Sequence, residues 1–586
     1  MACHSGPPRW SIAAATMSSL ASHRGRYLTF PARVARRDDW PRLWPGMTRT
    51  PPRPALFWTA KQSGPARPAR GKRQMKPFTR TALVSVSALA FAAPVLAVTG
   101  EEVLQNACAA CHVQHEDGRW ERIDAARKTP EGWDMTVTRM MRNHGVALEP
   151  EERAAIVRHL SDTRGLSLAE TEERRYILER EPVAWDEGPD TSMTQTCGRC
   201  HSYARVALQR RTPEDWKHLV NFHLGQFPTL EYQALARDRD WWGIAQAEII
   251  PFLARTYPLG EAPDAYADDA SGAYVLAGRQ PGRGDYTGRL VLKKAGEDYE
   301  VTMTLDFADG SRSFSGTGRI LGAGEWRATL SDGTVTIRQI FALQDGRFSG
   351  RWHDADSDVI GGRLAAVKAD AAPQVLAVAP ARLKIGEETQ LRVAGTGLGS
   401  DLTLPEGVAG SVESAGNGVT VLKLTATGTP GPVSLELGGQ KVDLVAYDRP
   451  DRISIVPDLT IARIGGNGGP IPKVPAQFEA MGWLNGPDGQ PGTGDDIALG
   501  AFPASWATDN FDEEAEKMQD AKYAGSIDDT GLFTPAEAGP NPERPMQTNN
   551  AGNLKVIATV DAEGEPLSAE AHLYATVQRF VDAPIR

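Results

Sequence analysis

Cys108-Ala109-Ala110-Cys111-His112 is the stretch that decides the class of this chain, and its pattern returns as Cys197-Gly198-Arg199-Cys200-His201. Two cysteines separated by two residues and followed directly by histidine are typical of covalent haem c attachment. Each thiol adds to a haem vinyl group, and the adjacent imidazole is held where it can bind the iron. A pair of disulfides or a four-cysteine zinc site are alternatives, but neither explains the histidine after each motif. The sequence therefore predicts two covalent haem c groups, attached at Cys108, Cys111, Cys197 and Cys200.

The sequence after each motif is also repeated. Thr129-Pro130-Glu131-Gly132-Trp133 follows the first motif, and Thr212-Pro213-Glu214-Asp215-Trp216 follows the second. A later helical stretch repeats an i, i+1, i+4 apolar pattern: Ile156, Val157 and Leu160 in the first copy, and Ile249, Ile250 and Leu253 in the second. An internal repeat of this kind predicts two cytochrome lobes in tandem, within an all-α dihaem cytochrome c domain at residues 98–262.

The repeat also indicates the second axial ligand of each iron. Met140 follows Trp133 at the same distance along the chain as His223 follows Trp216. Thioether and imidazole groups are both established haem-iron ligands. We therefore expect His112 and Met140 to bind the first haem iron, and His201 and His223 to bind the second.

Other side chains compete for these positions. The rivals are Met135, Met141 and His144 in the first lobe, and His218 in the second. A methionine on a helix face usually packs in a core, so only its place in the repeat favours Met140. Because a thioether raises the potential of a haem relative to a second imidazole, we expect electrons to enter near the bis-histidine haem. They would leave from the histidine/methionine haem.

The N-terminal 97 residues look like a leader. Residues 75–97 have the layout of a secretory signal peptide, with a basic start, an apolar run and a cleavage signal ending at Ala97. Residues 1–74 are then an upstream misannotation or a disordered extension. The rest of the chain has 48 basic and 72 acidic residues, a formal net charge of −24. Such a charge disfavours binding to nucleic acid or to anionic lipid. No later stretch is apolar for long enough to span a membrane. We therefore expect a periplasmic protein.

From about residue 264 the sequence alternates apolar and polar residues between glycine-rich turns, which is typical of antiparallel strands. The expected fold class is multidomain α + β, with the dihaem domain followed by three antiparallel β domains. These are a barrel at 263–370, an immunoglobulin-like domain at 371–447 and a β-sandwich at 448–586. The apolar positions of the first are expected to form a core rather than a ligand cavity. In the last, residues 485–496 resemble a calcium loop without EF-hand spacing, and a surface hairpin is the favoured interpretation.

No catalytic constellation stands out in the chain. It has five cysteines, of which Cys3 lies in the leader and four are used by the haem motifs. His353, beside Trp352 and Asp354, is better explained as a structural histidine than as a base. We expect no catalytic residue on this chain, and a β portion that acts as a platform for other subunits.

On these residues the chain resembles the alpha subunit of the quinohemoprotein amine dehydrogenase family. The resemblance rests on the first motif with Thr-Arg-Met-Met-Arg-Asn-His-Gly at 138–145, and on the second motif with Asp-Trp-Lys-His-Leu-Val-Asn-Phe-His at 215–223. The order of one dihaem domain before three β domains adds to it.

The resemblance implies a heterotrimer with a β-propeller beta subunit and a small gamma subunit that holds a cysteine tryptophylquinone. In that complex, an oxidoreductase acting on CH–NH₂ groups, primary amines become aldehyde and ammonia at the quinone. Electrons then pass through the two haems to an external carrier, such as a blue-copper protein or small cytochrome c. The cysteine count agrees, since no thiol is left for a quinone cross-link. A cytochrome subunit of another quinoprotein dehydrogenase and a dihaem peroxidase are the alternatives.

Overall fold

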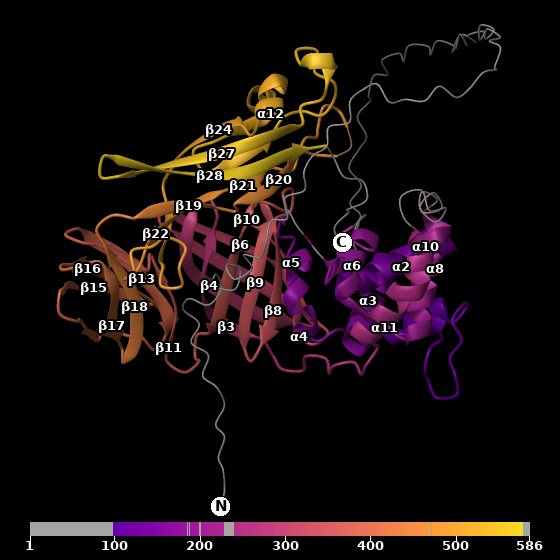
Figure 1. The fold of residues 1–586 in the computed structure, drawn as a ribbon. Coiled ribbons are helices and arrows are strands. Elements are labelled where there is room, and N and C mark those ends of the chain that lie inside the picture. The colour runs from indigo at the N-terminus through magenta and orange to yellow at the C-terminus, as the bar shows by residue number, and fades with distance from the viewer. Residues whose placement is uncertain are drawn as a thin grey trace, which may run out of the picture. The chain divides into compact units, whose positions relative to one another are not determined.

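The computed structural model describes residues 98–183, 186, 188–198, 201–227, 240–469 and 471–577. They form a helical part at 100–256 and a long β part after it, in agreement with the expected α + β chain (Figure 1). The predicted signal peptide at 75–97, residues 1–74 and Cys200 lie outside the described residues. Among the described helices, none is both long and apolar enough to cross a membrane.

The first long helix after each haem motif begins in the same way. α2 (Pro130–His144) follows Thr129, whose hydroxyl accepts a hydrogen bond from the backbone of Gly132 at 3.2 Å. α8 (Pro213–Gln226) follows Thr212, whose hydroxyl accepts from the backbone of Asp215 at 3.1 Å. Threonine is a favoured N-cap, and proline fits the first helical position because an N–H there has no intrahelical partner. The repeated Thr-Pro-x-x-Trp sequence thus produces two equivalent helix starts.

The other elements of the helical part surround these two helices. The helices are α1 (Gly100–Val103), α3 (Pro150–Arg164), α4 (Leu168–Thr171), α5 (Arg175–Leu178), α6 (Thr191–Thr196), α7 (Ala204–Ala207), α10 (Trp241–Ile244) and α11 (Ile250–Thr256), with π-helical segments at Leu104–Cys108 and Ala245–Ile249 and a 3-10 turn at Glu172–Arg174. Two short strands, β1 (Ala126–Lys128) and β2 (Gln209–Arg211), pair with each other. The part has two equivalent cores: Trp133 with Ile156 and Leu160 in the first, and Trp216 with Ile249 and Leu253 in the second.

A closed eight-stranded barrel follows the helices. Every pair of neighbouring strands in it is antiparallel. Its strands are β3 (Gly272–Gln280), β4 (Gly284–Ala295), β5 (Asp298–Phe307), β6 (Gly310–Leu321), β7 (Glu325–Ser331), β8 (Thr336–Gln344), β9 (Arg347–Asp354) and β10 (Gly361–Lys368). The predicted barrel is therefore present.

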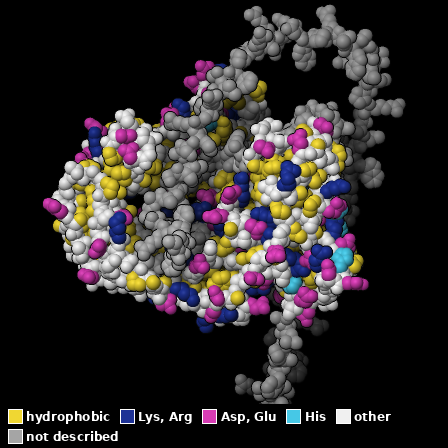
Figure 2. All heavy atoms as spheres, turned by 60° about the horizontal axis from the view of Figure 1, so that its bottom comes forward, with side chains coloured by type: hydrophobic (Ala, Val, Ile, Leu, Met, Phe, Trp, Pro, Cys, Tyr) yellow, Lys and Arg dark blue, Asp and Glu magenta, His cyan; other side chains and the backbone are white. Residues whose placement is uncertain are grey.

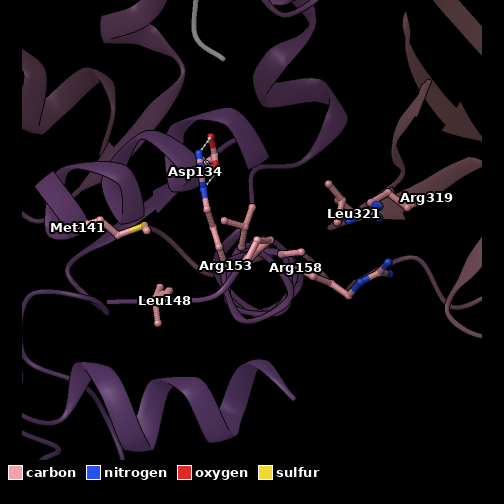
Figure 3. A pocket seen from close by; sticks show the side chains of 10 residues that line it. Asp134, Met141, Leu148, Arg153, Arg158, Arg319 and Leu321 are labelled. Carbon is pink, nitrogen blue, oxygen red and sulfur yellow. Dashed lines mark hydrogen bonds and ion pairs between the residues drawn. The ribbon is translucent and has the colours of Figure 1, made fainter. Parts of the chain in front are cut away.

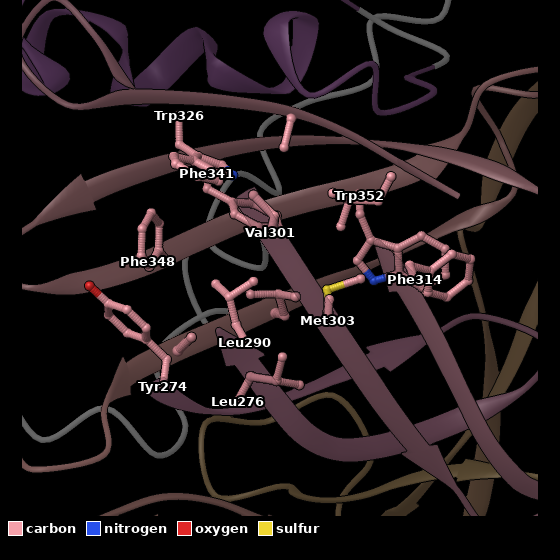
Figure 4. Packing of buried hydrophobic residues seen from close by; sticks show 14 of the residues in the cluster. Tyr274, Leu276, Leu290, Val301, Met303, Phe314, Trp326, Phe341, Phe348 and Trp352 are labelled. Atoms are coloured by element: carbon pink, nitrogen blue, oxygen red, sulfur yellow. The ribbon is translucent and has the colours of Figure 1, made fainter. Parts of the chain in front are cut away.

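Large side chains fill the interior of this barrel (Figure 4). Alternate residues of each strand point inward because the side-chain period of a strand is two, and β5 buries every second residue. The polar atoms among them find partners: Trp326 Nε1 donates to Gln339 Oε1 at 2.9 Å, and Trp352 Nε1 donates to the hydroxyl of Tyr286 at 2.7 Å. The barrel interior is a packed core, as expected from the sequence.

Residues 374–447 form two four-stranded sheets around one core of aliphatic side chains. One sheet has the order β11 (Gln374–Ala379), β13 (Glu388–Thr396), β16 (Val419–Ala426) and β15 (Val408–Gly416). The other has the order β12 (Arg382–Lys384), β18 (Gln440–Tyr447), β17 (Gly431–Leu437) and β14 (Leu402–Thr403).

The last β region, residues 452–576, has three sheets and two short helices. The sheets are β19 (Arg452–Val456), β22 (Glu479–Leu484) and β23 (Ile497–Phe502); β20 (Leu459–Arg463), β28 (Glu565–Thr576), β27 (Gly552–Ala562) and β24 (Ser505–Asn510); and β21 (Ala476–Gln477), β26 (Leu532–Pro535) and β25 (Gly525–Ile527). The helices are α12 (Glu513–Met518) and α13 (Asp520–Tyr523). Residues 485–496 join the antiparallel strands β22 and β23, so the predicted hairpin is confirmed.

The sheets of these last two regions are not purely antiparallel. β12 pairs with β18 in parallel, and β20 pairs with β28 in parallel. Parallel neighbours need a long connection between them, and here each pair joins a strand near the start of its region to one near the end. The expectation of antiparallel strands alone is wrong at these two pairs, because a period-two pattern does not reveal strand direction.

Acidic and basic side chains are interspersed over the face of the molecule in Figure 2. Several exposed side chains of opposite charge pair, such as Lys293 Nζ with Glu300 Oε2 at 3.0 Å. Exposed pairs of this kind contribute only about 0–1 kcal/mol to stability. The ionic contacts that matter for the fold are the buried ones.

A buried ionic network joins the helices to the barrel. Glu325 at the start of β7 is 2% exposed, and its carboxylate accepts from Arg175 of α5 at 2.6 and 2.9 Å. Arg327 donates to Glu325 at 2.8 Å and to Glu131 of α2 at 2.6 Å. Burial opposes ionisation of Glu325, but the guanidiniums of Arg175 and Arg327 outweigh it and lower its pKa to about 2. The network therefore ties α2, α5 and β7 together through charges.

Replacing Glu325 by glutamine is expected to destabilise the protein by about 3 kcal/mol, because it removes the carboxylate that Arg175 and Arg327 share and leaves each with one remaining acidic partner, Glu179 and Glu131. Because the pKa of Glu325 is lower in the folded chain than its ordinary value of 4.5, its contribution is complete above about pH 4.5 and is lost as the pH falls towards 2. Thermal unfolding of the holoprotein across this range measures both effects. Glu300→Gln, at an exposed pair of the same barrel, is the matched control and should cost less than about 1 kcal/mol. Equal losses of stability in the two variants would contradict the conclusion that the buried network stabilises the fold more than an exposed ion pair does.

Candidate functional site

The first cysteine of each motif lies at a helix end and packs against the core of its own lobe. Cys108 ends the π-helical turn after α1, is partly buried and contacts the first core. Cys197 follows α6 and contacts the second core in the same way. Cys111 is exposed, and Cys200 lies outside the described residues. The two motifs thus occupy equivalent places at the surface of the two cores.

Three predicted iron-binding histidines share one hydrogen-bonding arrangement. The Nδ1 atom of His112 lies 3.0 Å from the carbonyl of Glu121, that of His201 lies 2.9 Å from the carbonyl of Ser202, and that of His223 lies 2.7 Å from the carbonyl of Leu219. A carbonyl oxygen only accepts, so Nδ1 carries the proton in each ring. In the neutral imidazole this leaves the lone pair on Nε2, which is how a backbone carbonyl orients a metal-binding histidine. The donor set therefore fits a haem iron.

His223 lies in a strongly positive environment. Burial lowers its pKa below the ordinary 6.5, its bond to the carbonyl of Leu219 partly opposes this, and the charges of Arg205, Arg139 and Arg211 lower the pKa further. The ring is therefore neutral near pH 7. A neutral imidazole is the form that can bind iron.

The methionines of α2 differ in their surroundings. Trp133 and Val137 are buried in the first core, and Met141 packs against the same core. Met140 is partly buried and does not belong to that cluster. Met135 lies beside the second lobe, with its sulfur 3.9 Å from Nη2 of Arg205. Among the three, Met141 is thus engaged in packing and Met135 in the contact between lobes.

The two rival histidines occupy outer positions. His144 is exposed at the end of α2. His218 is partly buried on α8, with Nε2 at 3.4 Å from Glu214 Oε1 one helical turn away. Their positions give no reason to prefer them over Met140 and His223.

A pocket of about 410 Å³ lies between α2, α3 and β6 (Figure 3). Apolar side chains, including Met141 and Leu148, line it together with the ion pair of Arg153 and Asp134, whose atoms lie 2.7 Å apart. None of the predicted iron ligands lines this pocket. It is a feature of the junction between the first lobe and the barrel.

The two lobes face each other across a short antiparallel pair. β1 pairs with β2 so that Arg127 lies opposite Arg210, which occupies the equivalent position of the repeat. The pair therefore has a local twofold relation. Glu170 lies between the two central arginines, at 2.8 Å from Arg127 Nη2 and 3.0 Å from Arg210 Nε. One carboxylate thus links equivalent residues of both lobes.

The twofold relation extends to the tryptophans. Trp133 Nε1 donates to the carbonyl of Arg164 at 2.9 Å, and Trp216 Nε1 donates to that of Tyr257 at 3.1 Å, each at the end of the later helix of its lobe. This pairing of lobes was missed from the sequence. The equal spacing from Arg127 to Trp133 and from Arg210 to Trp216 was the available signal.

The remaining predicted sites have ordinary roles in the structure. His353 lies in β9 and is fully buried, with Nδ1 at 2.7 Å from the carbonyl of Asp354. In the 485–496 loop Asp496 pairs with Arg452. Within the described ranges, no cluster of three or more histidine, cysteine or acidic side chains could hold a metal ion.

Solved structures give no further guidance about the chain. A redesigned β-barrel is 13% identical, with a TM-score of 0.15, and the match covers 17% of this chain and 87% of that chain. Protocadherin gamma B7 is 13% identical at a TM-score of 0.14, over 40% of this chain and 57% of that one. Drosophila N-cadherin is 11% identical at 0.15, over 54% and 95%. Likenesses this weak carry no argument, and no curated protein matches the chain.

Comparison with protein families, in contrast, identifies the family of this chain. Residues 98–263 match the haem-binding domain of the alpha subunit of quinohemoprotein amine dehydrogenase. Residues 267–369, 372–448 and 453–585 match domains II, III and IV of the same subunit. The four matches follow each other in order and together span most of the sequence. The chain therefore belongs to the family of quinohemoprotein amine dehydrogenase alpha subunits.

Proposed function

We propose that this chain is the dihaem electron-transfer and scaffold subunit of a periplasmic amine dehydrogenase complex. Electrons from a tryptophylquinone on another subunit pass through two c-type haems to an external carrier. The observation that carries the proposal is the duplicated lobe, in which both motifs meet equivalent cores and each proximal histidine presents Nε2. Family membership supports the oxidoreductase complex.

Within this proposal, Cys108 and Cys111 attach one haem, and Cys197 and Cys200 attach the other. His112 and Met140 bind the first iron, and His201 and His223 bind the second. The haems, when bound, would supply one-electron chemistry, and the chain would hold one in each of the two lobes that the β1–β2 pair joins. Because a thioether favours the reduced iron more than an imidazole does, electrons enter at the bis-histidine site and leave from the histidine/methionine site.

The rest of the chain is proposed to serve processing and assembly. Residues 75–97 act as a signal peptide cut after Ala97, and residues 1–74 are either an upstream misannotation or a disordered extension. The domains are then 98–262 (dihaem), 263–370 (barrel), 371–447 (immunoglobulin-like) and 448–586 (sandwich). The β domains support a β-propeller beta subunit and a small gamma subunit that carries the cysteine tryptophylquinone, where amine oxidation to aldehyde and ammonia occurs. A blue-copper protein or a small cytochrome c accepts the electrons.

Met140→Ala is expected to abolish the weak band near the red end of the oxidised spectrum that reports a methionine–iron bond. Met141→Ala is the matched control, because its side chain packs in the core, and it should lower stability while keeping the band. His223→Ala should keep the band and open the second haem to carbon monoxide. Loss of the band in Met141→Ala but not in Met140→Ala would contradict the ligand assignment.

The protein purified from its native host should contain two covalently bound haems and two companion chains, one with a cross-linked quinone. Peptide mass spectrometry counts the haems and their thioether bonds, and potentiometric titration should resolve two different midpoint potentials. Rapid carbon monoxide binding by the unmodified reduced protein would favour a peroxidase instead. Fewer than two haems, or amine oxidation without companion chains, would refute the proposal.

A further inference from the structure

Positive charge is concentrated between the two lobes. Five basic side chains interact there, and we call them the seam cluster: Arg122, Lys128, Arg139, Arg205 and Arg211. They come from both lobes and from the β1–β2 pair that joins them. Asp215 is the carboxylate that the structure places among them, paired with Arg211 and 3.7 Å from Arg122.

Lys128 is the most enclosed member of the cluster that lacks a carboxylate. It is 8% exposed, its Nζ donates to the hydroxyl of Thr136 at 2.7 Å, and the same atom lies 4.5 Å above the ring of Trp133. No carboxylate of the described residues forms an ion pair with it. Burial, followed by the charges of Arg211 and Arg139, lowers its pKa well below the ordinary value, and the charge of Asp215 opposes this only in part. A buried ammonium in this state is costly unless an anion accompanies it.

The repeat indicates what Lys128 lacks. Arg211 is its counterpart in the second lobe and lies over the ring of Trp216 as Lys128 lies over that of Trp133. Arg211 pairs with Asp215, which is 4% exposed. The position equivalent to Asp215 in the first lobe is Gly132. A side chain there would begin 3.0 Å from Cβ of Lys128. The second lobe therefore carries its own counter-ion, and the first lobe has none at the matching place.

Arg139 is a second cation without a carboxylate in the described structure. Its Nε donates to the carbonyl of Met135 at 3.2 Å, and its guanidinium lies 5.9 Å from the ring centre of Phe222 in the other lobe. Two cations of the seam thus form no ion pair with a carboxylate of the described residues.

We propose that Lys128 and Arg139 bind the propionate carboxylates of a covalently attached haem. The inference rests on the proposed dihaem function, because each haem brings two propionates into this domain. A guanidinium and an ammonium bind carboxylates through charge-assisted hydrogen bonds. Ferric iron carries one more positive charge than ferrous iron, so a cation beside the propionates favours the ferrous form. The pair therefore positions the haem and raises its midpoint potential.

Lys128→Met in the full chain, matured with its haems, tests this. The ferric-to-ferrous equilibrium of one haem should shift about tenfold towards ferric, a fall of about 59 mV for a one-electron couple. The propionate bending band in the resonance Raman spectrum should shift as well. Lys217→Met is the matched control, since Lys217 is an exposed lysine of the same domain. It should leave both potentials unchanged, and Lys128→Arg should restore most of the wild-type value.

Should Lys128→Met fail to accumulate, Gly132→Asp provides the missing carboxylate within the chain and should lower the same potential. If Lys128→Met carries two haems and both midpoint potentials stay unchanged, the inference about the propionates is wrong, while the proposed dihaem function still stands. A haem count below two would refute the proposed function and the inference together. The difference in midpoint potential between wild type and Lys128→Met must also persist in buffer without chloride and phosphate. If the difference vanished there, a solvent anion rather than a propionate would be the partner of Lys128, and the proposal would be overturned.

Discussion

The short antiparallel pair of β1 and β2 is the contact on which the helical domain depends. Its register places Arg127 opposite Arg210, so each lobe presents the same side to the other. Arg127 is 6% exposed, and Nη1 donates to the carbonyl of Gly165 at 3.0 Å while Nε donates to that of Leu259 at 2.7 Å. A buried guanidinium with this many acceptors is costly to break. The pair therefore fixes the relative orientation of the two haem-motif lobes with three residues from each.

The same pairing explains the uneven charge of the domain. Bringing equivalent faces together also brings their cations together, and repulsion follows unless anions lie between them. Glu170 neutralises the two central arginines, and Asp215 neutralises Arg211. Lys128 and Arg139 remain without an ion pair to a carboxylate of the described residues, and the charge of Arg139 also acts on His223. Burial, and after it these like charges, lower the pKa of His223, which suits an iron ligand because a neutral imidazole binds iron.

The β part is attached to this domain by a different kind of contact. Glu325 of the barrel joins Arg175 and Arg327 in a buried network that reaches α2 through Glu131. The interior of the barrel is filled with packed side chains, so the barrel is a rigid support for the helices that contact it. Because α2 carries Met140, a charge network anchored in the barrel also restrains the helix of a predicted axial ligand.

The sequence alone determined the haem-binding class of this protein and much of its organisation. Two Cys-x-x-Cys-His motifs with repeated Thr-Pro-x-x-Trp stretches, and period-two patterning after residue 264, were enough to predict a helical dihaem domain and a β-barrel, since these signals are local. The assignment of Met140 and His223 rests on the same repeat and stays a prediction. Only the tertiary structure decided the twofold pairing of the lobes, the parallel pairs β12–β18 and β20–β28, and the fact that Lys128 forms no ion pair with a carboxylate of the described residues. The physical reason is that these features depend on contacts between residues far apart in the chain, and no local pattern encodes them.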